Sequence, residues 1–187
     1  MVPITALWIP IVVAAVFVFI VSSIMHMALT YHRSDYRQLP HEGEVLDALR
    51  RAGVTAGNQY HFPYCASHKE MGKPEIVEKY KQGPIGLLTV MPSGPPNMAK
   101  FLGLWFVYTL LVGFFVAYLA GRTLASGAPY LVVFRVAGAT AFMAYGLSQF
   151  ADSVWKGQTW SVTAKHILDG LVFALVTAGT FGWLWPR

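Results

Sequence analysis

Apolar residues fall into four blocks along this chain, each about as long as a bilayer is thick and separated from the next by polar segments. The blocks cover residues 8–29, 101–120, 130–150 and 167–185. About 20 apolar residues of helix cross the hydrocarbon of a bilayer, where a helix satisfies its own backbone groups. The pattern therefore predicts an all-α integral membrane protein, a four-helix transmembrane bundle forming a single membrane domain over residues 1–187.

The polar segment 31–100, between the first two blocks, has the pattern of a small folded unit. A helix is predicted over residues 44–52, with an acidic first turn and a basic last turn. Proline opens a second predicted helix over residues 74–83, which ends at a glycine. Residues 60–65 and 85–91 have strand composition. We expect a small α/β-like extramembrane loop subdomain here.

The composition narrows the class of protein further. Apolar residues make up 55% of the chain and charged residues only 12%, against about 25% charged in an average soluble domain. The single cysteine, Cys65, excludes an intrachain disulfide framework and a zinc site of several thiolates. The net charge is +5, but the basic residues adjoin apolar blocks, so we expect the lipid bilayer rather than nucleic acid as the partner.

The distribution of basic residues predicts the topology. Eleven of the 14 Lys and Arg residues lie in segments 31–100 and 151–165, whereas the opposite face has Arg122 and Arg187. Cytoplasmic loops carry an excess of Lys and Arg. We therefore expect a cytoplasmic large loop and both termini outside, in a bacterial inner membrane. An unpaired Cys65 agrees with a reducing compartment.

With this topology, several polar side chains gather at the cytoplasmic end of the bundle. They are His26, Gln149, Asp152, His166 and Asp169. Ionisable residues in membrane spans are costly and often mark a ligand, metal or proton site. Imidazoles with carboxylates suit a hard or borderline divalent ion, and two facing histidines could hold a haem iron. His32 and Asp35, just after the first block, could extend the site as a proton or metal relay.

A structural interpretation of the same residues stays open. Asp152, His166 and Asp169 could simply lie among lipid headgroups. In that case Asp169 would be a favourable charge in the first turn of the fourth helix. His32 and Asp35 would then belong to an interfacial collar whose cations meet anionic lipid. The sequence names no cofactor for this site.

The loop offers a second set of potential metal ligands. His61, Cys65 and His68 lie within eight residues, in an H-x3-C-x2-H spacing. The spacing matches no established zinc motif, and on an extended strand His68 would face the opposite side from the other two. The alternative is that these are ordinary loop residues without a metal.

Two arginines on the outer side have no acidic residue near them. Arg122 and Arg135 lie where the sequence offers no Asp or Glu as a partner. Each is a candidate for contact with an anion or a lipid phosphate, and snorkelling to phosphate is the simpler interpretation.

Small residues recur every four positions in two of the predicted helices and would let backbones approach closely. They are Gly113, Ala117 and Gly121 in one helix, and Gly170, Ala174 and Ala178 in the other. Such stripes indicate helix packing, either within the chain or between chains. A homo-oligomer or a larger membrane complex is therefore one expectation.

No stretch matches a phosphate-binding loop, a dinucleotide fingerprint, a nucleophile elbow, a metalloprotease helix or a c-type haem motif. Whether the protein is an enzyme stays open. The first hypothesis is a non-enzymatic, self-associating or accessory subunit of a membrane complex. The alternative is a cofactor- or metal-binding membrane oxidoreductase component that uses His26, His166 and nearby carboxylates. An oligomeric transporter or channel is weaker, because no predicted helix has a polar face along its full length.

Overall fold

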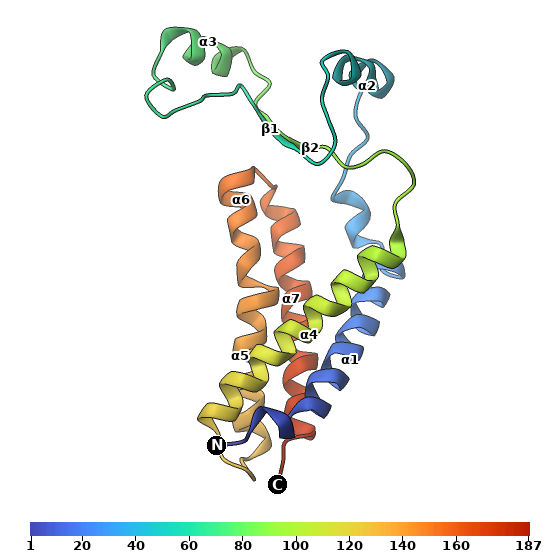
Figure 1. Cartoon of the computed structure of the whole chain (residues 1–187), viewed down its shortest axis with the longest axis vertical. Coiled ribbons are helices and arrows are strands. Elements are labelled where there is room, and N and C mark those ends of the chain that lie inside the picture. The colour runs from blue at the N-terminus through green and yellow to red at the C-terminus, as the bar shows by residue number, and fades with distance from the viewer. The chain divides into compact units, whose positions relative to one another are not determined.

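The computed structural model describes all 187 residues, and 65% of them are helical (Figure 1). Four helices are long and apolar enough to cross a membrane, as the apolar blocks predict. They are α1 (Trp8–Met27), α4 (Met98–Thr123), α5 (Tyr130–Tyr145) with its continuation α6 (Phe150–Lys156), and α7 (Trp160–Trp183). The chain divides into two compact units, one formed by Met1–Tyr36 with Asn97–Arg187 and the other by Arg37–Pro96.

The first unit is a bundle in which α1 packs against α4 and α7, and α5 packs against the same two helices. Both chain ends lie at one end of the bundle (Figure 1). There the Val2 N–H donates to the Gly121 carbonyl, and the Gly127 N–H donates to the Pro186 carbonyl, both at 2.8 Å. The end of α1 and the beginning of α7 therefore lie at the opposite end, together with the 3-10 turn η2 (Tyr31–Ser34).

The third apolar segment is interrupted where it touches α7. Helix α5 ends at Tyr145, and the 3-10 turn η3 (Leu147–Gln149) joins it to α6. A Cβ on Gly170 of α7 would lie 2.6 Å from the backbone of Gly146. Because the two backbones are in direct contact, only glycine fits at position 170.

The small-residue stripes pack within the chain. A Cβ on Gly113 would lie 3.3 Å from Ile11, and one on Gly138 would lie 3.1 Å from Ala178. Ala117 and Ala174 are buried as well. These stripes are used by neighbouring helices of the same bundle, so they no longer argue for contacts between copies.

The second unit contains helices α2 (Glu42–Arg51) and α3 (Pro74–Gln82) and a two-stranded antiparallel sheet. Strand β1 (Gln59–Phe62) pairs with β2 (Gly86–Thr89), with Gln59 opposite Thr89 and Phe62 opposite Gly86. Both helices and both strands lie close to their predicted positions. No residue of this unit is buried, so it has no hydrophobic core of its own.

Candidate functional site: a histidine and carboxylate cluster

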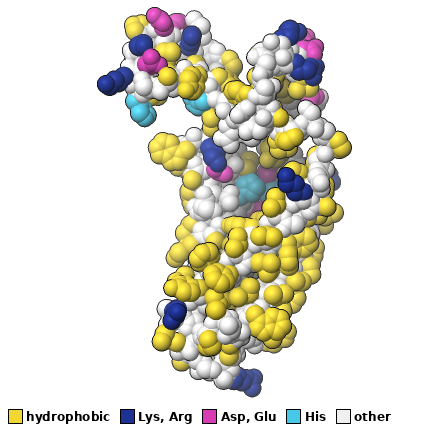
Figure 2. Space-filling model, in the orientation of Figure 1, with side chains coloured by type: hydrophobic (Ala, Val, Ile, Leu, Met, Phe, Trp, Pro, Cys, Tyr) yellow, Lys and Arg dark blue, Asp and Glu magenta, His cyan; other side chains and the backbone are white.

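Asp169 is the centre of a polar cluster at the end of the bundle away from the termini. Its side chain belongs to α7 and the residue is only 1% exposed. The Tyr31 hydroxyl donates to its Oδ1, and His32 Nε2 lies 2.8 Å from its Oδ2. Figure 2 shows acidic and histidine side chains in a hollow near this end, above a largely apolar face.

The alternative that placed Asp169 in the first turn of its helix is wrong. Helix α7 begins at Trp160, about two and a half turns before Asp169. At that depth no free backbone N–H of the helix start is available to the carboxylate. Its partners instead come from η2, a segment more than 130 residues away in the sequence.

His32 lies between two carboxylates. Its Nδ1 is 2.6 Å from Asp35 Oδ2, and its Nε2 contacts Asp169. An ionised carboxylate only accepts hydrogen bonds, whereas a neutral imidazole carries one N–H donor. His32 therefore bridges the two carboxylates through its two ring nitrogens.

Lys165 of α7 connects this helix to η2 and the adjoining Asp35 through three hydrogen bonds. Its Nζ donates to Asp35 Oδ1 at 2.6 Å, to the Tyr31 carbonyl at 2.7 Å and to Ser34 Oγ at 2.8 Å. Burial by itself would raise the pKa of the Asp35 carboxyl, but the hydrogen bonds and charges of Lys165 and His32 outweigh it and lower this pKa. Burial, followed by the contact with Asp169, raises the pKa of the Tyr31 hydroxyl.

Two more imidazoles face the same carboxylate oxygen without hydrogen-bonding to it. His26 Nε2 and His166 Nδ1 each lie 4.0 Å from Asp169 Oδ2. The rings are stacked, with centroids 4.5 Å apart for His26 and His32 and 5.5 Å apart for His32 and His166. Three imidazoles thus surround one buried carboxylate oxygen, more than an ion pair requires.

The donor atoms of His26, His32 and Asp169 lie within 4.8 Å of one another, near enough to share a metal ion. His26 Nδ1 donates to the Ser22 carbonyl at 3.0 Å, and His32 Nδ1 donates to Asp35. These hydrogen bonds leave each Nε2 to act as a ligand, the usual arrangement of metal-bound histidines. The stacking of His26 on His32, with ring centroids 4.5 Å apart, leaves no room for a haem between these two rings. A haem held by His26 and His166, the pair that the sequence suggests, stays a hypothesis.

A cavity of about 280 Å³ borders the cluster. Its lining consists of His26, Trp105, Tyr108, Tyr145, Gln149, His166, Asp169 and Phe173. An apolar groove of about 540 Å³ adjoins it, because His26 and Trp105 line both. The groove is otherwise formed by the end of α1 and the beginning of α4.

Asp152 lies outside this cluster. It belongs to α6, beyond the interruption at η3, and its carboxylate pairs with Lys156 at 2.7 Å. His32 and Asp35, which the sequence could also assign to a lipid-binding collar, lie inside the cluster instead.

The potential metal ligands in the loop do not form such a cluster. His61, Cys65 and His68 line one surface pocket of about 290 Å³ together with Tyr80. The single group of metal-ligating side chains close enough to share an ion is the bundle cluster, and it includes none of them. His61 Nδ1 donates to the Pro63 carbonyl at 3.0 Å. A metal site in the loop stays a prediction.

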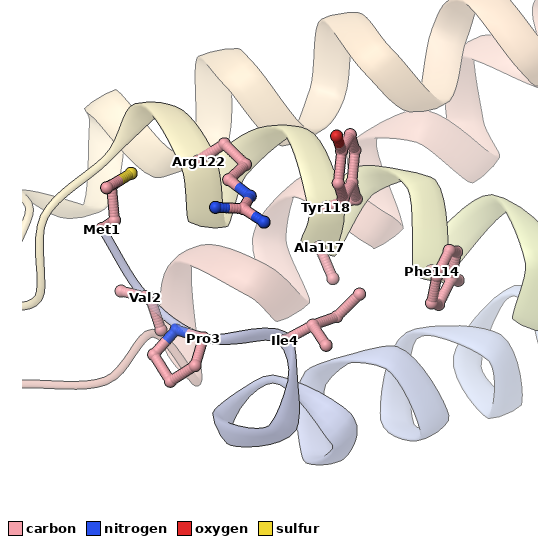
Figure 3. Close-up of a pocket in the computed structure, with 8 residues that line it drawn as sticks. All are labelled: Met1, Val2, Pro3, Ile4, Phe114, Ala117, Tyr118 and Arg122. Carbon is pink, nitrogen blue, oxygen red and sulfur yellow. The ribbon is translucent and has the colours of Figure 1, made fainter.

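Arg122 borders a pocket of about 520 Å³ at the end of the bundle that holds the chain termini (Figure 3). Its guanidinium lies 5.8 Å from the centre of the Tyr118 ring. Arg135 borders a smaller, apolar pocket between α5 and α7. Neither arginine forms an ion pair within the chain, in keeping with the absence of acidic residues there. Contact with an anion or a lipid phosphate stays a prediction for both.

The sequence interpretation missed two members of the cluster, Tyr31 and Lys165. Lys165 precedes Asp169 by four residues, so both side chains lie on one face of a helix. Tyr31 adjoins His32 in the same turn. These relations were visible in the sequence, but they became informative only once α7 was known to begin before Lys165.

No protein-family model matches this chain, and no curated protein or solved structure is detectably similar to it. The chemistry of the cluster therefore carries the functional argument alone.

Proposed function

We propose that this protein is an integral membrane protein that binds one divalent transition-metal ion through His26, His32 and Asp169. In this proposal it is the metal-binding component of a membrane oxidoreductase. The four apolar helices span a bacterial inner membrane, with the termini outside and the metal site at the cytoplasmic end. The length and composition of the helices support membrane insertion, and the excess of basic residues in the large loop supports the orientation.

The observation that carries the metal site is the convergence of three imidazoles on one buried carboxylate oxygen. His32 alone satisfies Asp169 Oδ2, and the Tyr31 hydroxyl satisfies Oδ1. A purely structural ion pair would need neither His26 nor His166 at 4.0 Å. A metal ion held by His32 and Asp169 uses one of these additional nitrogen donors, His26, and replaces the proton between His32 and Asp169.

The ligand set also indicates the kind of ion. Two imidazoles with one carboxylate suit Zn²⁺ or Fe²⁺, of which only Fe²⁺ changes oxidation state as the proposed oxidoreductase role requires. Three protein ligands leave coordination positions open for water or substrate. Asp35 accepts from the second ring nitrogen of His32, as an outer carboxylate does in many metal centres. The arrangement therefore resembles a reactive metal centre more than a closed structural one.

Metal titration tests this proposal. Full-length protein in detergent is stripped with a chelator and titrated with Co²⁺ and Zn²⁺, and affinity is measured by absorption and calorimetry. We expect one ion per chain. Asp169→Asn should weaken binding by more than the roughly 10- to 100-fold typical of losing an outer-shell partner, whereas the control Asp152→Asn should leave it unchanged.

His26→Gln provides a second test should Asp169→Asn fail to fold. His26 has a half-exposed side chain and a single hydrogen bond within the chain, so its loss should preserve the fold and still weaken metal binding. Unchanged affinity in His26→Gln, or no binding by the wild-type chain, would overturn the proposal.

A second candidate function is an accessory or self-associating subunit of a membrane complex. The second unit, Arg37–Pro96, favours it, because 60 residues without a buried side chain gain stability from a surface they lie against. A photo-crosslinking residue placed at Leu46 or Ile85, both exposed, tests this in intact membranes. A defined protein adduct would support the subunit role, and recovery of the chain free of adducts would contradict it.

A further inference from the structure

We propose that the cavity beside the cluster binds a hydroxylated aromatic ring of the phenol or quinol type, with a ring oxygen directed toward the metal position. This inference rests on the proposed metal site and names the class of molecule that the site receives.

The open side of the metal position faces the cavity. Two of the three proposed ligands, His26 and Asp169, line it, whereas His32 does not. The other ring nitrogen of His32, Nδ1, instead forms a hydrogen bond with Asp35. A ligand that completes the coordination of the ion would therefore approach from the cavity, opposite His32.

Aromatic rings form the walls. Trp105 and Tyr108 from α4, Tyr145 from α5 and Phe173 from α7 all border the cavity. The rings meet edge to face, at 62° for Trp105 with Phe173 and 80° for Tyr145 with Phe173. Aromatic surfaces in this arrangement accept a further planar ring through stacking and edge contacts.

The polar atoms of two wall residues are already paired. Trp105 Nε1 donates to Ser22 Oγ at 2.8 Å, and the Tyr108 hydroxyl donates to the Ala144 carbonyl at 3.0 Å. The His166 ring and the Gln149 carboxamide have no hydrogen-bond partner within the chain, although both border the cavity. They are available to a ring oxygen of the bound molecule.

The volume suits a small planar molecule. At about 280 Å³ the cavity lies just below the 300–1,000 Å³ typical of ligand pockets. The adjoining groove is larger and apolar, with Met27, Met98, Phe101 and Leu102 along it. An apolar tail on the ring would fit there. The shared chemistry is the hydroxylated ring, which a free phenol or a tailed quinol would supply.

Equilibrium dialysis of the Zn²⁺-loaded protein in nanodiscs tests the inference with three probes. They are hydroquinone, decylhydroquinone and decylbenzene. We expect decylhydroquinone to bind at least about tenfold more tightly than decylbenzene, the equivalent of about one good hydrogen bond. Equal binding of these two probes would overturn the inference, because the ring oxygens would then contribute nothing.

Two variants locate the binding. Gln149→Leu should weaken both oxygenated probes severalfold while Zn²⁺ affinity stays unchanged, and Gln82→Leu in the second unit is the control. Ser23→Phe fills the groove without touching the cavity, so it should weaken the tailed probe alone. Wild-type affinity of both oxygenated probes in Gln149→Leu, with equal loss of tailed and untailed probes in Ser23→Phe, would contradict the proposed position.

The outcomes also separate the inference from the metal proposal. Zn²⁺ binding without a preference for oxygenated rings leaves the metal site in place and removes the ring site. Failure to bind Zn²⁺ removes the metal site first. Similar affinity for hydroquinone and decylhydroquinone supports the ring site with a free phenol as its source, whereas preference for the tailed probe supports a quinol lipid.

Discussion

The two groups of potential metal ligands in this chain differ in whether the fold brings their side chains together. His61, Cys65 and His68 are close in sequence, yet the structure does not bring them into a ligand cluster. His32 and Asp169 are 137 residues apart, yet they are in hydrogen-bonding contact. Local spacing in a loop leaves donor directions free, whereas helix packing around a buried carboxylate fixes them. The packing of α1, η2 and α7 therefore explains why the ligands of the bundle converge and those of the loop do not.

The largest effect expected from this comparison is on metal affinity when ligands are removed from each group. His26→Ala with His32→Ala should abolish measurable binding, because one ligand would remain. His61→Ala with His68→Ala should leave affinity within about twofold, a change of only about 0.4 kcal/mol. Calorimetric titration of both double variants with Zn²⁺ checks this, and loss of binding in the loop variant would reverse the comparison.

A smaller effect is expected from Asp35, which contacts the proposed ligand His32 and would not touch the ion itself. Asp35→Asn should weaken metal binding by about 10- to 100-fold, as loss of an outer-shell partner does. The matched control is Asp47→Asn, an exposed carboxylate that pairs with Arg50 in α2. Equal affinities for the two variants would show that Asp35 does not orient His32.

The next largest effect is expected on stability, when the close contact between the backbones at Gly170 and Gly146 is disturbed. Gly170→Ala places a Cβ 2.6 Å from Gly146, so it should destabilise the protein by about 1–3 kcal/mol, as overpacking does. Gly103→Ala in α4 meets nothing within 4 Å and should be neutral or slightly stabilising, by up to about 1 kcal/mol. Thermal unfolding in detergent checks this, because Gly170→Ala should lower the melting temperature whereas Gly103→Ala should leave it unchanged or raise it slightly.

The smallest effect is expected on the pH dependence of stability. Because the folded-state pKa of Asp35 lies below its ordinary value of 3.8, its ionisation adds stability that is fully present above about pH 5. That stability is lost as the pH falls through the folded pKa. Melting temperatures between about pH 6 and pH 3 should therefore fall less steeply in Asp35→Asn than in the wild type. Parallel curves would contradict the assignment.

Much of the fold follows from the sequence, because the apolar blocks are long and distinct. An even number of spans also predicted that His26, His166 and Asp169 share one end of the bundle. The burial of Asp169 did not follow, since α7 begins at Trp160, before the apolar block starts. Tertiary packing extended the helix into a polar stretch that hydropathy alone assigns to a loop.

The composition of the cluster was harder to predict than its location. Asp152 was expected to join it, but the interruption at Gly146 and an i, i+4 partner in Lys156 give that carboxylate a separate position. Lys165 was counted only as a charge of the connecting loop, although it holds Asp35. Contacts between segments so far apart in sequence depend on helix rotation, which the hydrophobic pattern does not fix.

X-ray absorption spectroscopy at the zinc edge of the Zn²⁺-loaded, full-length protein tests the proposed metal centre most directly. We predict a first shell of nitrogen and oxygen neighbours at about 2.0–2.2 Å, with imidazole scattering from two histidines and no sulfur. A sulfur neighbour at about 2.3 Å would place the ion at Cys65 in the loop. That result, or a shell of water oxygens alone, would contradict a metal centre at His26, His32 and Asp169.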